Sequence, residues 1–323
     1  MRRHLLHDWF LVWFGLGVFA IGASQGFAVQ AAEPPPMQPQ QAAPGAWYVQ
    51  GLSEAGSSAN QNFIANAGFV VTAQGVVVID ALGTPALAQR MLDQIRRITT
   101  QPVSHVIVTH YHPDHFYGLQ TFKAMGARII AHRAARDYLH SEQAQARLAA
   151  SRQTMAPWVD NQTRLIDADD WLDAERTLSV GGVLFQIKPM GPAHTPEDLV
   201  VYLPEKKLLF AGDLVFGNRV PFVGQSDSGQ WAKALDALLS FDATVIVPGH
   251  GPVSTQARAD LQLTRDYLLH LRRTMGQAAR DMEPFDAAYQ SADWRHFEHL
   301  PMFQLVNRIN AYNTFLLMER ESP

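Results

Sequence analysis

The chain has 323 residues, of which 47% are hydrophobic and 17% are charged, and its formal net charge is −4. This composition is typical of a globular protein, and the lack of any basic run predicts that nucleic acids are not among its partners. Because the sequence contains no cysteine, disulfides, thiolate metal ligands and a cysteine nucleophile are all excluded.

The first 31 residues have the pattern of an export signal. Two arginines precede an apolar run at 10–23 that is short for a membrane span, and small residues follow it. We therefore expect a periplasmic or secreted protein, without stable membrane insertion once a signal peptide of residues 1–31 is removed. An uncleaved anchor is the alternative, and both the general secretory and the twin-arginine routes fit. Residues 32–46, rich in Pro, Gln and Ala, are expected to form a flexible tether.

Residues 47–256 are expected to form one domain with two similar halves. In the first half, the segment 85–98 has an amphipathic helical pattern, with Thr84 as a candidate N-cap and Pro85 at the first helical position. Short apolar runs between turn residues predict the strands around this helix. The expected strands lie at 63–72, 75–80, 103–110 and 128–132, and a second helix is expected at 116–126.

The second half repeats the order of strand meander, helix and strand. After a helical stretch at 137–158, a hairpin is expected to turn at Pro204 to Lys207. Two β-rich halves that each carry helices predict two sheets face to face with helices outside, a four-layer αββα sandwich. Strands are expected at 183–190, 199–203, 208–213 and 243–251, a helix at 230–240, and C-terminal helices at 257–280 and 302–320, within a segment 257–323 packed on the domain.

The stretch "HYHPDH" carries the clearest chemical signal. His110 and His112 are two positions apart, so in extended chain they point the same way. Pro113 then bends the chain, and Asp114 and His115 should point away from the first pair. One loop can thus supply two ligands to each of two neighbouring metal ions, and imidazole with carboxylate suits zinc. A solvated polar loop is the alternative.

Three more candidate ligands follow predicted strands. His194 lies in "GPAHT", His250 lies in "PGHG", and Asp213 ends the apolar run "LLFAGD". The neighbouring glycine and alanine residues allow backbone segments to approach closely. Because strand ends that converge at one edge of a sandwich form a site, the three residues are expected to complete the metal centre begun by the histidine-rich loop.

Together, these residues resemble the metallo-β-lactamase superfamily over positions 62–252. The resemblance implies the αββα sandwich, a site for two Zn²⁺ ions, and an aspartate behind the ligands that accepts a hydrogen bond from them. It assigns His110, His112 and His194 to the first ion, Asp114, His115 and His250 to the second, Asp213 to both, and Asp80 to the position behind the ligands.

Within the superfamily, the full ligand set is more like that of glyoxalase II and lactonases than that of the zinc β-lactamases, which have cysteine in place of Asp213 or lack the bridging ligand. The basic C-terminal residues with which glyoxalase II binds glutathione have no clear counterpart. Residues 191–216 and 307–320 are most similar to the exported quinoprotein relay system zinc metallohydrolases. Those proteins are often found with quinone-dependent dehydrogenases, which implies such an enzyme as a functional partner.

The expected activity is hydrolysis of an ester, thioester, lactone or lactam in a small-molecule substrate. A hydroxide shared by the two zinc ions would attack the carbonyl, and Asp114 would orient it and carry a proton. Arg219, Phe222 and Trp231 are candidates to line the substrate cleft, with Arg219 available for an anionic group. The alternatives are true β-lactamase activity, a mononuclear iron enzyme similar to persulfide dioxygenases, and a non-catalytic accessory protein of a quinone system.

Overall fold

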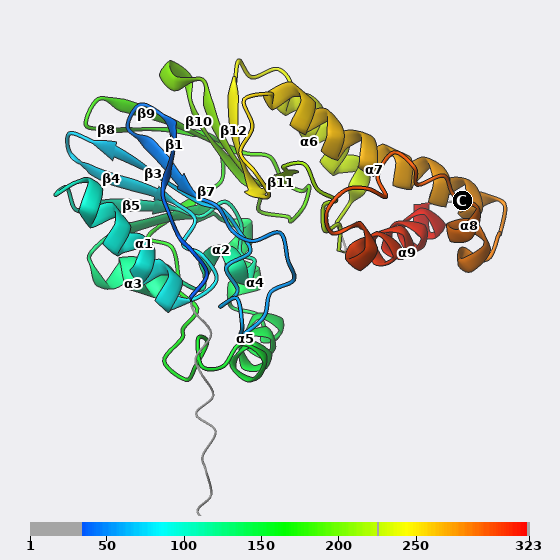
Figure 1. Ribbon diagram of the computed structural model, residues 1–323, viewed down its shortest axis with the longest axis horizontal. Coiled ribbons are helices and arrows are strands. Elements are labelled where there is room, and N and C mark those ends of the chain that lie inside the picture. The colour runs from blue at the N-terminus through cyan, green and yellow to red at the C-terminus, as the bar shows by residue number, and fades with distance from the viewer. Residues whose placement is uncertain (1–33, 225, 322–323) are drawn as a thin grey trace, which may run out of the picture. The chain divides into compact units, whose positions relative to one another are not determined.

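Two β-sheets packed face to face form the centre of the molecule. The computed structural model describes residues 34–224 and 226–321, and the expected signal peptide lies outside them. Apolar side chains from both sheets fill the space between them, and each sheet carries helices on its outer face (Figure 1). This arrangement confirms the predicted αββα sandwich. Of the helices in the described ranges, none has both the length and the apolar character that crossing a bilayer requires.

The first sheet has seven strands in chain order. Neighbouring strands from β1 to β4 are antiparallel, and those from β4 to β7 are parallel. The strands are β1 (Gln40–Ala43), β2 (Ala46–Val49), β3 (Ala67–Thr72), β4 (Gly75–Ile79), β5 (Val103–Ile107), β6 (Arg128–His132) and β7 (Asp170–Leu172). The helices of this half are α1 (Pro85–Ile98), α2 (Pro113–Phe116), α3 (Leu119–Ala124), α4 (Ala134–Leu139) and α5 (Glu142–Thr154).

Part of the expected tether belongs to this sheet. Strand β1 pairs with β2 at the sheet edge, and the Tyr48 hydroxyl donates to Gln40 Oε1 at 2.9 Å. Upstream, Arg90 donates to the carbonyl of Pro35 at 2.6 Å. The flexible segment expected at 32–46 is therefore ordered from Pro35 onward. An edge strand is held by backbone hydrogen bonds, so it can consist of Gln and Ala without an apolar pattern.

Helix α1 shows how local sequence fixes an element. The Thr84 hydroxyl accepts a hydrogen bond from the backbone N–H of Leu87 at 3.1 Å, as the N-cap prediction requires. Leu87, Met91 and Ile95 follow at a spacing of four residues and are buried in the cluster under the first sheet. One apolar face therefore docks the helix on the sheet.

The second sheet has the strand order β12-β11-β10-β9-β8. Strands β8 to β11 are antiparallel neighbours, whereas β11 and β12 are parallel. The predicted turn of the hairpin is the short 3₁₀ helix η1 (Pro204–Lys206), followed by Lys207 with a positive φ of 46°. The strands are β8 (Arg176–Val180), β9 (Val183–Pro189), β10 (Leu199–Leu203), β11 (Leu208–Phe216) and β12 (Val245–His250), and α6 (Ser228–Leu238) packs beside β11.

The C-terminal segment forms the predicted long helices α7 (Ala257–Arg280) and α9 (Phe303–Glu321), with the unpredicted short helix α8 (Phe285–Ser291) between them. A buried polar group joins α7 to α9, because the Tyr267 hydroxyl donates to Asn307 Oδ1 at 2.8 Å and accepts from Asn310 Nδ2 at 3.0 Å. Asn310 also donates to the carbonyl of Pro221 at 2.7 Å. Helix α9 thereby fixes the segment that follows β11.

Candidate metal centre

The histidine-rich loop connects β5 to α2 at the edge of the first sheet. Strand β5 ends at Ile107, so His110 lies in the loop itself and not, as expected, at the end of a strand. Pro113 takes the first position of α2, and the change from extended to helical backbone there separates the two pairs of side chains. The two halves of the loop therefore face two adjacent positions, as the spacing predicted.

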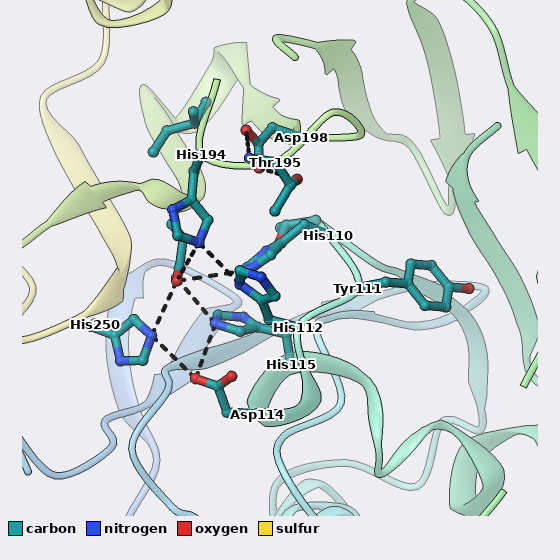
Figure 2. Close-up of polar contacts among 12 residues, drawn as sticks. His110, Tyr111, His112, Asp114, His115, His194, Thr195, Asp198 and His250 are labelled. Atoms are coloured by element: carbon teal, nitrogen blue, oxygen red, sulfur yellow. Dashed lines mark hydrogen bonds and ion pairs between the residues drawn. The ribbon is translucent and has the colours of Figure 1, made fainter. Parts of the chain in front are cut away.

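Four side chains form the first donor group. His112 Nδ1 lies 3.2 Å from His110 Nε2 and 3.0 Å from His194 Nε2. Asp213 Oδ2 lies 3.3 Å from His194 Nε2 and 3.7 Å from His110 Nε2. Figure 2 shows these imidazole rings converging from the two sheets. The group thus joins a loop of the first sheet to two segments of the second.

A second donor group lies against the first. His250 Nε2 is 3.2 Å from Asp114 Oδ2, and His115 Nε2 is 3.7 Å from the same oxygen (Figure 2). Asp213 contacts this group as well, with Oδ1 at 3.1 Å from His115 Nε2 and Oδ2 at 3.3 Å from His250 Nε2. The structure thus brings together all seven side chains predicted as metal ligands, with Asp213 between the two groups.

The spacing of these atoms fits bound zinc. Ligand atoms about 2.0–2.1 Å from a tetrahedral zinc ion lie about 3.3–3.4 Å from one another, which is close to most of the separations seen here. In addition, His115 Nε2 and Asp213 Oδ1 are buried and, although they lie 3.1 Å apart, neither makes a hydrogen bond of acceptable geometry in the described part of the chain. Buried polar atoms without a partner cost free energy that a metal ion would recover. The residues therefore fit two ions, one for each group.

The histidines of the first group are neutral at physiological pH. Burial lowers the pKa of His112 to about 3, and the neighbouring His194 adds to this effect. Burial likewise lowers the pKa of His194 to about 4 and that of His110 well below its ordinary value. Because metal ions bind the unprotonated imidazole, these side chains need not lose a proton before they bind an ion.

In the second group, the histidine pKa values are raised instead of lowered. Burial disfavours the charged form of His115, but the carboxylates of Asp213, Asp114 and Asp80 outweigh burial and raise its pKa well above the ordinary value. The pKa of His250 is raised in the same way, chiefly by Asp213. Metal binding at this group must therefore displace protons from the two imidazoles.

Hydrogen bonds at the far side of three rings set their orientation. His115 Nδ1 donates to Asp80 Oδ2 at 2.9 Å, and His250 Nδ1 donates to the carbonyl of Ile64 at 2.8 Å. The Thr109 hydroxyl donates to Asp80 at 2.8 Å and is left to accept from His110 Nδ1 at 3.1 Å. In each ring Nδ1 is the donor, so Nε2 faces the centre. Asp80 thus lies behind the donors, as predicted.

Two further carboxylates, which sequence reasoning missed, hold the donor loops. Asp198 accepts from the backbone N–H and the hydroxyl of Thr195, both at 2.8 Å, and so closes the turn that carries His194 (Figure 2). Glu197 Oε1 accepts from the backbone N–H of Tyr111 at 3.2 Å and ties that turn to the histidine-rich loop. The sequence signal that could have identified them is the pair of acidic residues three and four positions after the histidine in "HTPED".

Asn66 performs the same task for the loop of His250. Its side-chain amide donates to the carbonyls of Pro248 at 2.8 Å and Gly251 at 2.9 Å, and Oδ1 accepts from the backbone N–H of Gly51 at 3.0 Å. These bonds join the start of β3 to the end of β12. No sequence signal pointed to Asn66, because its partners in the β12 loop are 182 and 185 residues away.

Close backbone packing was expected beside the ligands, and Gly249 provides it. A Cβ atom at this position would collide with the carboxylate of Asp213 and would lie 2.8 Å from its backbone nitrogen. Only glycine leaves room for Asp213 between β11 and β12.

The three predicted cleft residues have different environments. Trp231 is fully buried, its indole N–H donates to the carbonyl of Leu214 at 3.0 Å, and its ring centroid is 5.0 Å from that of His194. The prediction that Trp231 lines the cleft is therefore wrong, since the first turn of α6 directs it under His194. Phe222 is 43% exposed, whereas Arg219 is only 4% exposed and packs its guanidinium on the Phe216 ring.

Comparisons with known proteins agree with this geometry. The sequence model of the metallo-beta-lactamase superfamily matches residues 61–250. The linear primary-alkylsulfatase of Pseudomonas sp. (strain ATCC 19151) is 25% identical over 236 residues, which cover 61% of this chain and 44% of that protein. The metallo-beta-lactamase IND-1 of Chryseobacterium indologenes is 26% identical over 195 residues, which cover 59% of this chain and 73% of that protein.

Two solved structures share the fold. The sec-alkylsulfatase Pisa1 from Pseudomonas sp. superposes with a TM-score of 0.69 at 20% identity, over 87% of this chain and 50% of its own. The metallo-beta-lactamase from Pontibacter korlensis superposes with a TM-score of 0.57 at 24% identity, over 72% of this chain and 99% of its own. The chain thus spans half or less of the alkylsulfatases that it matches. Because the family model covers more than half of its residues, and because the sandwich carries the His/Asp cluster, this chain belongs to the metallo-β-lactamase superfamily.

Proposed function

We propose that the chain is a dinuclear zinc hydrolase that cleaves an ester, thioester, lactone or lactam. The observation that carries this proposal is the pair of donor groups that share Asp213, whose two oxygens both face imidazole nitrogens. Each ion would have three ligands of its own and would share Asp213 with its neighbour. Structural zinc sites are normally single ions closed by four protein ligands, whereas two ions held side by side are typical of hydrolytic enzymes. The paired arrangement therefore favours catalysis over a purely structural role.

Bound zinc would supply an activated water molecule and polarise the bond to be cleaved. Among the chain's own residues, Asp114 is the candidate for contact with the water molecule. Its side chain is 15% exposed, whereas that of Asp213 is 5% exposed. Burial alone would raise the pKa of Asp114, but His115 and His250 outweigh burial and lower it. Asp114 is therefore an ionised carboxylate on the open side of the cluster, placed to orient water and to accept its proton.

Hydrolysis of a sulfate ester is the second candidate. The specific observation in its favour is the linear primary-alkylsulfatase, which matches 236 residues of this chain at 25% identity. The same donor groups suit this reaction, because a sulfate ester also needs an activated water molecule and a polarised electrophile.

We further propose that the protein is exported and that it acts beside a quinone-dependent dehydrogenase. The support is the signal-like pattern of residues 1–31 and the similarity of residues 191–216 and 307–320 to the quinoprotein relay system metallohydrolases. Cell fractionation tests the location, and co-purification with a dehydrogenase tests the partner.

Metal analysis combined with a substrate panel tests the reaction. The purified protein should contain close to two zinc ions per chain and should hydrolyse at least one of nitrocefin, a lactone, a glutathione thioester and an alkyl sulfate. His112→Ala should abolish turnover, whereas the exposed His140→Ala should not. Full activity after zinc is removed would contradict the proposal, and one iron per chain would favour the persulfide dioxygenase-like alternative.

A further inference from the structure

The far nitrogen of His194 is buried without a hydrogen-bond partner. The Nε2 atom of this ring faces the centre, 3.0 Å from His112 Nδ1 and 3.3 Å from Asp213 Oδ2. Its Nδ1 atom is buried and makes no hydrogen bond to any residue that the structure describes. When Nε2 is free to bind an ion, the proton of the neutral ring lies on Nδ1. A buried N–H group without an acceptor costs free energy, so the surroundings of this atom need a physical explanation.

Oxygen acceptors occupy the same position behind other donor rings. The Nδ1 atom of His115 donates to a carboxylate, and that of His250 donates to a backbone carbonyl. Such partners fix the orientation of a metal-binding imidazole and raise its basicity as a ligand. The Ser226 hydroxyl donates to the backbone carbonyl of His194 at 2.9 Å, which fixes the main chain but not the ring. Another group must therefore hold the imidazole of His194.

The indole of Trp231 packs against this imidazole. The two ring centroids are 5.0 Å apart, and the ring planes are inclined at 63°. This separation and angle are those of an edge-to-face pair, in which the edge of one ring points at the face of the other. The indole N–H of Trp231 is already donated to the carbonyl of Leu214 at 3.0 Å. This bond leaves the indole face, and not its N–H edge, available to His194.

A second aromatic ring beside His194 is less well placed. The Phe216 centroid is 6.1 Å from that of His194, and Phe216 already stacks on His250 with the ring planes only 5° apart. The guanidinium of Arg219 also lies over the Phe216 ring. Trp231 is the nearer ring, and it is fully buried, so water does not compete for its face.

We propose that the indole face of Trp231 accepts a hydrogen bond from His194 Nδ1 and that Trp231 is thereby a positioning residue for the first donor group. An aromatic face accepts N–H groups weakly. The attraction grows when the donor ring carries positive charge, as an imidazole does when it binds a cation. Trp231 thus supports the metal-bound form of His194 more than the free form. This inference deepens the proposed function and rests on it for the presence of an ion.

Two substitutions separate the aromatic face from packing. Trp231→Leu removes the face and should weaken one of the two zinc ions about 3- to 30-fold in competition with a chromophoric chelator, with the other ion unchanged. Trp231→Phe keeps a face and should weaken the same ion less than about threefold. Phe297→Leu is the matched control, because Phe297 is buried in the same apolar cluster and its ring contacts are with Tyr267, His270 and His296. It should lower the thermal midpoint without changing either zinc affinity.

A nuclear magnetic resonance spectrum of the wild type tests the same contact without a substitution. In the zinc-loaded protein with isotope-labelled histidine, the Nδ1 proton of His194 should resonate upfield of the Nδ1 protons of His115 and His250. The ring current shields a proton that lies over an aromatic face, whereas an oxygen acceptor deshields it. A nuclear Overhauser effect to the indole protons of Trp231 should identify the signal.

A His194 Nδ1 proton as far downfield as those of His115 and His250 would overturn the role of Trp231. Equal losses in Trp231→Leu and Trp231→Phe, unchanged affinity in both, or equal weakening of both ions would overturn it as well. Turnover is measured separately. If the wild type binds two zinc ions but hydrolyses no substrate of the panel, the proposed reaction fails, and the affinities and the spectrum still decide the role of Trp231. If the wild type binds no zinc, both proposals fail.

Discussion

Replacing Asp80 with asparagine should impair metal binding while leaving the fold intact. In the wild type, Asp80 Oδ2 accepts a hydrogen bond from His115 Nδ1 at 2.9 Å, and this directs Nε2 toward Asp213 and Asp114. Oδ1 accepts from the backbone N–H of Thr109 at 2.8 Å, and asparagine can keep this bond. Its amide would then face His115 Nδ1, so the ring would carry its proton on Nε2, the atom that must bind the ion.

Loss of such a partner behind a metal ligand typically lowers metal affinity 10- to 100-fold, which corresponds to about 1.4–2.7 kcal/mol. The effect should fall on the second donor group, so competition with a chromophoric zinc chelator should show one weakened ion and one unchanged ion. Asp93→Asn on the exposed face of α1 is the matched control. Wild-type affinity for both ions in Asp80→Asn would refute the reasoning, as would equal weakening of both.

Three further predictions concern stability and packing. Asn66→Ala removes three buried hydrogen bonds and should lower the free energy of unfolding by about 2–4 kcal/mol in urea; a loss below about 1 kcal/mol would contradict the role given to Asn66. Gly249→Ala should displace Asp213 and lower the zinc content while the far-UV circular dichroism stays unchanged; wild-type zinc content would show that the close packing is not required. Metal-free protein should be most stable near the ordinary histidine pKa of about 6.5. At lower pH the unfolded chain takes up protons that folded His112 and His194 resist down to about pH 3 and 4, so stability falls. At higher pH folded His115 retains a proton that the unfolded chain releases, so stability falls again. A free energy of unfolding in urea that rises steadily from about pH 5 to pH 9 would contradict this predicted maximum.

Elements with a local signature were predictable from the sequence. Thr84 and Pro85 marked the start of α1, and the spacing of His110, His112 and His115 placed two sets of donors on one loop. Trp231 could have been assigned correctly as well. It lies four positions before Leu235 in the helix expected at 230–240, so the two share one face, and both are buried on the inner face of α6.

Features that depend on distant contacts left no such signature. Asn66 is a single polar residue whose role arises only when β3 and β12 lie together. Strand β1 is held by backbone hydrogen bonds to β2, which do not depend on side-chain type. Its Gln- and Ala-rich composition therefore predicted a tether. The burial of Arg219, whose Nε and Nη1 atoms make no hydrogen bond in the described part of the chain, likewise follows from what surrounds it, and the sequence indicated only a candidate for the substrate cleft and an anionic group.

The division of donors between the sheets determines when a metal ion can bind. Each donor group combines residues of the 110–115 loop with residues at or after position 194. Neither half of the chain can therefore assemble an ion site alone, and metal uptake must follow the docking of the two sheets. The ions available in the compartment where docking takes place then compete for the finished centre, so the place of folding becomes a determinant of which metal the protein contains.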